Sequence, residues 1–251
     1  MTFPVYLRAG PVTLHPHWVF EALAYAVGFR AYLRLRARQG DHLDTDRRWW
    51  IVVAAIVGAA AGGKILFWLS DPALTLSRWR DPYYLMGGKT IVGGLIGGLL
   101  AVEWTKRRLG IVAATGDLFA LPLTLGIAIG RIGCFLTGLS DHTFGLPTRL
   151  PWGVDFGDGI PRHPTQLYEV AWLGLVALWL RWLSRRPHQR GDLFKYFMVA
   201  YMSFRLAIEW IKPGVALAGL TTIQWACLST LAYYRRALPR LCGTTEATAH
   251  G

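Results

Sequence analysis

The sequence has few of the residues that stabilise small secreted domains or structural metal sites. It contains three cysteines in 251 residues, and no two of them have the spacing of a zinc site or of a disulfide framework. No basic segment precedes a short apolar stretch at the N-terminus, so we expect no cleaved signal peptide. No internal repeat is visible. These absences argue against a disulfide-stabilised domain, a zinc-stabilised domain and a repeat protein.

Acidic residues are also scarce, with 15 Asp and Glu against 27 Lys and Arg and a net charge of +12. Such an excess invites a nucleic-acid interpretation, but the positions of the cations disfavour it. With the N-terminus outside, 16 of them fall in predicted inner loops and 6 in outer segments. This is the positive-inside asymmetry of a membrane protein with N-out, C-in topology. We therefore expect attraction to anionic lipids and no nucleic-acid partner.

Long apolar runs make up much of the chain, which is 53% hydrophobic with 12 tryptophans. About 20 apolar residues are needed for a helix to span a bilayer. The sequence thus predicts an all-α membrane protein of seven transmembrane helices, with a single polytopic domain over 1–241 and a disordered tail at 242–251. The connection at 138–165 is long and not of low complexity, so we expect it to be ordered on the outer side. The predicted helices are roughly 16–36, 49–69, 83–104, 114–137, 166–183, 193–212 and 217–233.

Arg131 is the most informative residue, because it lies in the apolar run LPLTLGIAIGRIGCFLTG. A charge at such a depth costs about 2.5–3.5 kcal/mol by insertion scales unless an anion offsets it. Helix directions place three further cations in the outer half, namely Lys64, Lys89 and Arg205. The acids predicted within the spans are fewer, namely Glu21, Glu169 and Glu209. A phospholipid phosphate, which arginine binds bidentately, is the anion that fits this excess.

A structural interpretation competes with phosphate binding. Arg205 and Glu209 have the i, i+4 spacing of a helix ion pair, and Arg131 and Glu169 can bridge two helices. Such pairs would stabilise the bundle, but they do not explain why the charges favour one leaflet.

Two enzymatic alternatives have weaker support. A metal site is disfavoured because only His15 and His17, among the histidines on the outer side, have a spacing typical of ligands. A Ser–His–Asp hydrolase is disfavoured because residues 140–142 (Ser-Asp-His) are adjacent in sequence and no nucleophile elbow is present. The glycine patches at 58–63 and 93–98 carry small-xxx-small spacing, which is typical of close helix packing; backbone approach to a bound lipid is the alternative.

Several segments resemble those of a known family. The sequences GRIGCF at 130–135 and HPTQLYE at 163–169 are similar to the two signature segments of prolipoprotein diacylglyceryl transferases. Further similar segments follow in the same order over nearly the whole chain: GPVTLH at 10–15, GGKILF at 62–67, IVGGLIGG at 91–98, and Tyr201-x-x-x-Arg205-x-x-x-Glu209.

The resemblance implies a transferase in the bacterial plasma (inner) membrane with its active site on the periplasmic side. It implies transfer of the diacylglyceryl group of phosphatidylglycerol to a cysteine thiol of a lipoprotein precursor, with release of glycerol phosphate. It implies no metal or organic cofactor. The sequence departs from the family at three positions, where Val92 replaces a histidine, Cys134 an asparagine and Lys64 an arginine.

The residues expected to act fall into two sets. Arginines preorganised around a phosphate stabilise the charge that develops when a C–O bond to it breaks, and the thiol acceptor must lose a proton. The sequence leaves three candidates for the general base that takes this proton: His142, its neighbour Asp141, and His17 with Glu21 one turn below. The catalytic candidates are Arg131, Arg205, His142, His17 and Glu169. The head-group-binding candidates are Arg131, Arg205, Lys64, Lys89, Tyr201, Glu209, His163, Gln166 and Tyr168.

Two rival functions remain open from the sequence. The same donor chemistry onto a hydroxyl of a glycan, polymer or lipid would suit a chain with Val92 and Cys134 in place of the family residues. A phospholipid-binding or flipping protein without chemistry would suit a buried cationic site that lacks the expected base.

Overall fold

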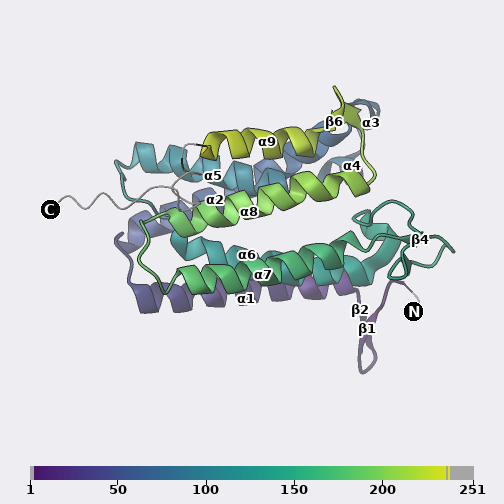
Figure 1. Ribbon diagram of the computed structural model, residues 1–251, viewed down its shortest axis with the longest axis horizontal. Helices are drawn as coiled ribbons and strands as arrows, with labels where there is room; N and C mark the ends of the chain where they lie inside the picture. The colour runs from purple at the N-terminus through teal and green to yellow at the C-terminus, as the bar shows by residue number, and fades with distance from the viewer. Residues whose placement is uncertain (1–2, 236, 238–251) are drawn as a thin grey trace. The chain divides into compact units, whose positions relative to one another are not determined.

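A computed structural model describes residues 3–235 and 237, and the described chain is mostly helical (Figure 1). The predicted helical class is confirmed, whereas the disordered tail predicted at 242–251 lies outside the described residues. The helices are α1 Pro16–Gln39, α2 Thr45–Ser70, α3 Pro72–Ser77, α4 Pro82–Met86, α5 Ile91–Arg108, α6 Asp117–Thr137, α7 Thr165–Leu183, α8 Asp192–Ile208 and α9 Thr222–Tyr234, with 3-10 turns η1 Gly138–Asp141 and η2 Glu209–Ile211.

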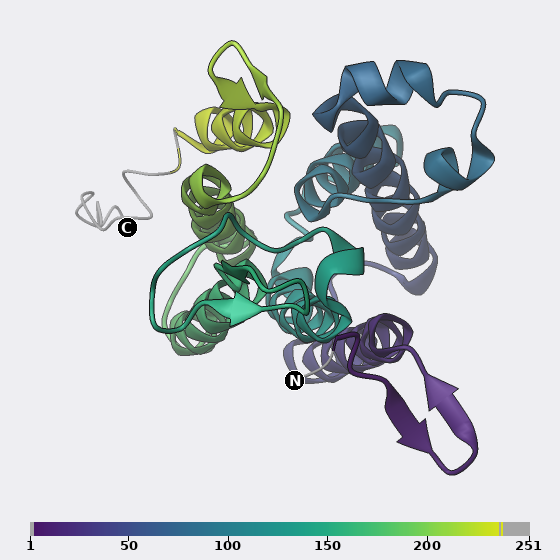
Figure 2. The ribbon, with the colours of Figure 1, turned by 90° about the vertical axis from the view of Figure 1, so that its right-hand side faces the viewer.

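Three two-stranded antiparallel hairpins accompany the helices. They are β1 Leu7–Ala9 with β2 Val12–Leu14, β3 Val154–Asp155 with β4 Pro161–Arg162, and β5 Ala216–Leu217 with β6 Leu220–Thr221. Figure 2 shows the first hairpin projecting from the start of α1. None of the three was predicted from the sequence, because each strand is too short to give an alternating pattern.

Among the described residues, two helical segments are long and apolar enough to cross a membrane, Thr45–Ser70 and Asp117–Asp141. These agree with two of the seven predicted spans. The number of spans and the N-out topology stay predictions from the sequence.

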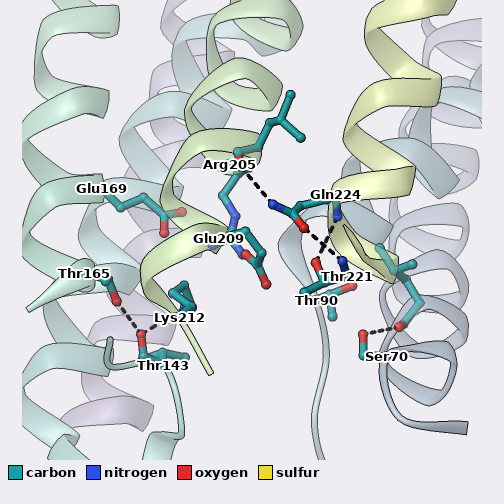
Figure 3. A network of polar contacts seen from close by, with 12 residues as sticks. Ser70, Thr90, Thr143, Thr165, Glu169, Arg205, Glu209, Lys212, Thr221 and Gln224 are labelled. Atoms are coloured by element: carbon teal, nitrogen blue, oxygen red, sulfur yellow. Dashed lines mark hydrogen bonds and ion pairs between the residues drawn. The ribbon is translucent and has the colours of Figure 1, made fainter. Parts of the chain in front are cut away.

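Three predicted helices have different limits in the structure. The helix predicted at 83–104 is two helices. The chain breaks at Gly87 and Gly88, because Gly88 has a left-handed φ of 58°, and the next helix starts where Thr90 caps α5. The helix predicted at 193–212 loses α-helical geometry after Ile208 and continues as η2. The helix predicted from 217 begins at Thr222 instead, because Thr221 and Gln224 form a capping box (Figure 3).

The described residues divide into two compact units. The first contains those within 1–40, 115–204 and 210–213, and the second contains those within 41–114, 205–209 and 214–251.

In the first unit α1 and α7 both pack along α6 (Figure 1). Small residues allow close approach of α1: a Cβ on Gly126 would lie 3.3 Å from the carbonyl oxygen of Ala24, and one on Gly133 would lie 2.6 Å from the Cβ of Phe20. This packing fixes the end of α6, which carries Arg131, against the start of α1.

In the second unit α2 and α5 pack through the two predicted glycine patches. A Cβ on Gly62 would collide with the carbonyl of Gly93, and one on Gly97 would collide with the carbonyl of Gly58. Both helices therefore present bare backbone to each other, as small-xxx-small interfaces do. The packing interpretation of these glycines is the one the structure supports.

The connection predicted to be ordered, 138–165, is folded. Phe156 at its centre is 2% exposed and packs against the rings of Phe3 and Phe135 at centroid distances of 5.1 and 5.8 Å. Backbone hydrogen bonds join Gly145 to His163 and Leu146 to Ile211.

An ion pair closes the β3–β4 hairpin of this connection. The guanidinium of Arg162 donates to both carboxylate oxygens of Asp158 at 2.6 and 2.7 Å. Its hydrogen bonds lower the pKa of Asp158 below the ordinary value. The segment that follows α6 is thereby held in a defined conformation.

Candidate active site

Arg131 is buried in the first unit beside a carboxylate. It is 6% exposed on α6, and its Nε lies 2.9 Å from Oε2 of Glu169 on α7, which is 2% exposed. The hydroxyl of Tyr201 on α8, fully buried, donates to the other oxygen of Glu169 at 2.6 Å. One carboxylate thus holds the guanidinium from one side and is itself held by a phenol. Desolvating this pair is costly, and the extra hydrogen bond offsets part of that cost.

The structural interpretation predicted two ion pairs, and both are present. The first is the interhelical bridge between Arg131 and Glu169. Arg205 Nη2 lies 2.9 Å from Glu209 Oε2 in the second unit, and the two residues are 4% and 5% exposed. The ion pair with Glu169 does not use the whole guanidinium of Arg131, since a guanidinium has five N–H donors. In the described part of the chain, the other side-chain contact of Arg131 is Nη1 with Cys134 Sγ at 4.0 Å.

Cys134 belongs to a second cluster next to Arg131. Sγ of Cys134, a ring nitrogen of His17 and a carboxylate oxygen of Asp141 all lie within 4.8 Å of one another. His17 Nδ1 is 3.0 Å from Asp141 Oδ1, and His17 Nε2 is 3.5 Å from Glu21 Oε2. The predicted pairing of His17 with Glu21 is thus present, and Asp141 adds a carboxylate on the other side of the ring.

Local sequence places these groups. His15 caps α1, and its ring accepts from the backbone N–H of His17 at 3.3 Å, which fixes the first turn of the helix. Gly138, with φ 74°, ends α6 and turns the chain so that η1 carries Asp141 back toward α1.

A chain of hydrogen bonds extends this cluster into the HPTQLYE segment. Thr143 Oγ1 donates to Asp141 Oδ2 at 2.7 Å and accepts from Gln166 Nε2 at 3.2 Å. The carbonyl of Thr143 accepts from Thr165 and Lys212 at 2.7 and 3.0 Å (Figure 3). Gln166 is 1% exposed. Its hydrogen bond holds Thr143 in place, and Thr143 in turn holds the carboxylate of Asp141.

Two other residues of the HPTQLYE segment, both head-group candidates, face each other. His163 Nδ1 lies 3.2 Å from the hydroxyl of Tyr168, which accepts from Trp152 Nε1 at 2.7 Å. This contact joins the connection 138–165 to the start of α7.

His142, the other candidate base, is placed differently. It is exposed just after η1 in a left-handed conformation with φ 52°. No side-chain contact joins it to His17 or Arg131 within the described residues.

In the second unit the two lysine candidates lie around the start of α5. The ammonium of Lys64 donates to the carbonyls of Met86, Gly87 and Gly88, the last at 2.9 Å. Lys89 is exposed in the same linker. Lys64 therefore fastens the linker that precedes α5. Val92, at the position where the resemblance implies a histidine, is 1% exposed.

The convergence of Cys134 and Asp141 with His17 is not predicted from the sequence. A signal was present, because Cys134 is one turn beyond Arg131 on the same helix and His17 begins a helix at the same predicted depth. The contribution of the η1 turn, which brings Asp141 back, had no such signal.

Comparison with known proteins identifies the family of the chain. The model of the prolipoprotein diacylglyceryl transferase family matches residues 4–234. Proteins named phosphatidylglycerol–prolipoprotein diacylglyceryl transferase are similar over most of the chain. That of Bordetella parapertussis is 33% identical over 88% of this chain and 88% of its own. That of Glaesserella parasuis is 31% identical over 94% of this chain and 94% of its own. That of Vibrio atlanticus is 30% identical over 86% of this chain and 81% of its own. The chain is a membrane transferase and belongs to the prolipoprotein diacylglyceryl transferase family.

Proposed function

We propose that this protein transfers the diacylglyceryl group of phosphatidylglycerol to the cysteine thiol of a lipoprotein precursor. The sulfur attacks the glyceryl CH₂ carbon, the C–O bond to phosphate breaks, and glycerol phosphate leaves with the bonding electrons. The observation that carries the proposal is Arg131, a buried cation one helical turn from a thiol, imidazole and carboxylate cluster. The names of the similar proteins supply the two substrates.

Arg131 is assigned the developing charge on the phosphate. Glu169 holds its Nε edge, which leaves the Nη edge near Cys134 for an anion. A guanidinium held in advance stabilises the leaving group without rearrangement, and one such donor contributes about 3–4 kcal/mol in other enzymes. For Arg205, paired with Glu209 in the second unit, and for Lys64 and Lys89 of the same unit, the head-group-binding role stays an expectation from the sequence.

His17 is assigned the base that removes the thiol proton. Asp141 lies at Nδ1 and stabilises the imidazolium, as a carboxylate does in an acid–base pair. An ordinary thiol has a pKa near about 8.5, so a base with this support raises the thiolate fraction where the reaction occurs. His142 has no comparable partner in the described chain and is the weaker candidate.

The location follows the positive-inside asymmetry of the sequence. An N-out, C-in chain places the start of α1 and the end of α6 at the outer face of the plasma membrane. We therefore assign the site to the periplasmic leaflet.

The test uses purified protein in detergent with labelled phosphatidylglycerol and a lipoprotein-type peptide bearing one cysteine. Arg131→Ala is expected to abolish release of glycerol phosphate, while Arg149→Gln, an exposed arginine in the connection 138–165, retains it. Membrane insertion of both variants is checked by fractionation. Undiminished release by folded Arg131→Ala would contradict the mechanism.

A hydroxyl acceptor is the second candidate, favoured by one observation. The buried Val92 provides no base where the resemblance implies a histidine. The same assay with sugar and glycerol acceptors in place of the peptide separates the two, because only one product is a thioether. The family assignment disfavours the third alternative, a binder without chemistry.

A further inference from the structure

The first unit has a small crevice at the opposite end of α6 from Arg131, where the ends of several helices meet. With the N-out topology predicted from the sequence, this end of the unit lies in the inner leaflet. The crevice is mostly apolar, and neighbouring positions of three helices contribute to its lining: Leu35 and Gln39 of α1, Ala120 and Leu121 of α6, and Leu180 and Ser184 at the end of α7.

Two pairs of arginines flank this lining. Each lining residue of α1 directly follows an arginine, Arg34 or Arg38. Each lining residue of α7 directly precedes one, Arg181 or Arg185. Successive residues of an α-helix are rotated by about 100°. Because α1 and α7 run in the same direction (Figure 1), the position before the lining on α1 and the position after it on α7 turn to the same side of the crevice.

The four arginines are exposed, and among the described residues no ion pair joins them to an acid. The acids near this end of the unit have other partners. The carboxylate of Asp117 accepts from the backbone N–H groups of Gly191 and Phe194 at 2.6 and 3.2 Å. Asp192 is buried and lies 3.0 Å from the ammonium of Lys195. The arginines on the two sides of the crevice therefore keep their positive charge available to an external anion.

A tryptophan marks the depth of this end of the unit. Trp182, in the last turn of α7, is exposed, and the guanidinium carbon of Arg186 lies 3.7 Å from the centroid of its ring. Exposed tryptophans in membrane proteins gather at the level of the lipid head groups. The arginines next to Trp182 are therefore at the height of lipid phosphates.

We propose that this crevice with its four arginines binds cardiolipin, the phospholipid with two phosphates, in the inner leaflet. One phosphate is held by Arg34 and Arg38, and the other by Arg181 and Arg185, because the guanidinium fork matches a phosphate. The acyl chains cover the apolar lining between the two pairs. Basic pockets between helices on the cytoplasmic side bind head groups of this kind. The lipid links α1 to α7, and this site is separate from the proposed transfer reaction.

The test titrates full-length protein in a nonionic detergent with cardiolipin. Bound lipid is read by native mass spectrometry and stability by the thermal midpoint. We expect one tightly bound cardiolipin and a higher midpoint, because a ligand that binds only the folded state stabilises it. Phosphatidylethanolamine, which has no net charge, is expected to leave the midpoint unchanged. Absence of bound cardiolipin on the wild-type protein would overturn the proposal.

Two double variants examine the two sides of the crevice independently. One is Arg34→Gln with Arg38→Gln, and the other is Arg181→Gln with Arg185→Gln. Each is expected to weaken cardiolipin binding by about 30-fold, since each of the two lost cations contributes a factor of about five. Thermal unfolding without lipid shows that each variant is folded. Unchanged affinity in either folded variant would refute the two-phosphate arrangement.

A matched control separates this site from general attraction between a basic protein and an anionic lipid. Arg107→Gln with Arg108→Gln removes the same charge from exposed positions at the end of α5, in the second unit. This variant is expected to bind cardiolipin as the wild type does. An equal loss of affinity in the control would show that total charge, and not the crevice, attracts the lipid, and the site would be rejected.

Discussion

Removing the charge of Glu169 tests whether the pair with Arg131 stabilises the fold, catalyses the reaction, or does both. Glu169→Gln keeps the size of the side chain and an oxygen that can accept from Tyr201, so the change isolates the ionic contact of 2.9 Å. Removing one member of a buried pair leaves an uncompensated charge, which costs about 3–5 kcal/mol. In a chain of this length about 1 kcal/mol corresponds to roughly 2–4 °C.

We therefore expect the thermal midpoint of Glu169→Gln in detergent to fall by roughly 10 °C, measured by circular dichroism. The matched double variant, Arg131→Met with Glu169→Leu, removes both charges. Apolar replacement of a whole buried pair is often neutral or stabilising, so the double variant should regain most of the midpoint. A midpoint of Glu169→Gln equal to that of the wild type would refute the energetic reasoning.

The double variant also distinguishes structure from catalysis. If Arg131 binds the phosphate, restored stability does not restore transfer, and release of glycerol phosphate stays below detection. If Arg131 only bridges α6 and α7, the double variant is both stable and active. That second result would leave the phosphate role without support, whatever the single variants do.

Three further predictions concern contacts outside this pair. Gly62→Val is expected to destabilise the second unit by about 1–3 kcal/mol, because its side chain would meet the α5 backbone; Gly174→Ala, with nothing near its Cβ, should leave the thermal midpoint unchanged. Lys64→Met should loosen the linker before α5, seen as faster hydrogen exchange there; equal exchange rates would contradict the role of its ammonium. Arg162→Gln should raise the pKa of Asp158 toward its ordinary value, read from an NMR pH titration. In the wild type the pair's stabilisation is therefore present at neutral pH and lost only as pH falls through the lowered pKa.

The sequence predicted the helical class, the position of most helices and the burial of Arg131, because apolar runs and an isolated charge are visible in one dimension. It predicted the wrong limits where local geometry intervenes. The break at Gly87 and Gly88 lies within an otherwise apolar stretch, and the capping box of Thr221 moves the start of α9 past a hairpin. Such features depend on backbone angles and side-chain caps that hydrophobic periodicity does not report.

The candidate site was predictable in its charges and not in its contacts. The excess of cations predicts a phosphate and leaves the pairing of Arg131 with Glu169 as an alternative, and the structure contains that pair. The convergence of His17 with Asp141 depends on the η1 turn after Gly138. A turn of this kind brings together residues more than a hundred positions apart, which spacing along the chain cannot indicate.

The substitution of Cys134 for the family asparagine gains a meaning from its position on α6. Arg131 and Cys134 are separated by one helical turn, and the guanidinium reaches both Glu169 and the sulfur. A lysine at 131 would offer a single point charge, whereas the planar guanidinium presents separate edges to two partners. The buried Val92 removes a base from α5, while His17 and Asp141 supply imidazole and carboxylate beside the arginine. A chain with Val92 at this position is therefore compatible with the proposed thiol chemistry, because an imidazole and a carboxylate lie next to Arg131, the proposed phosphate ligand.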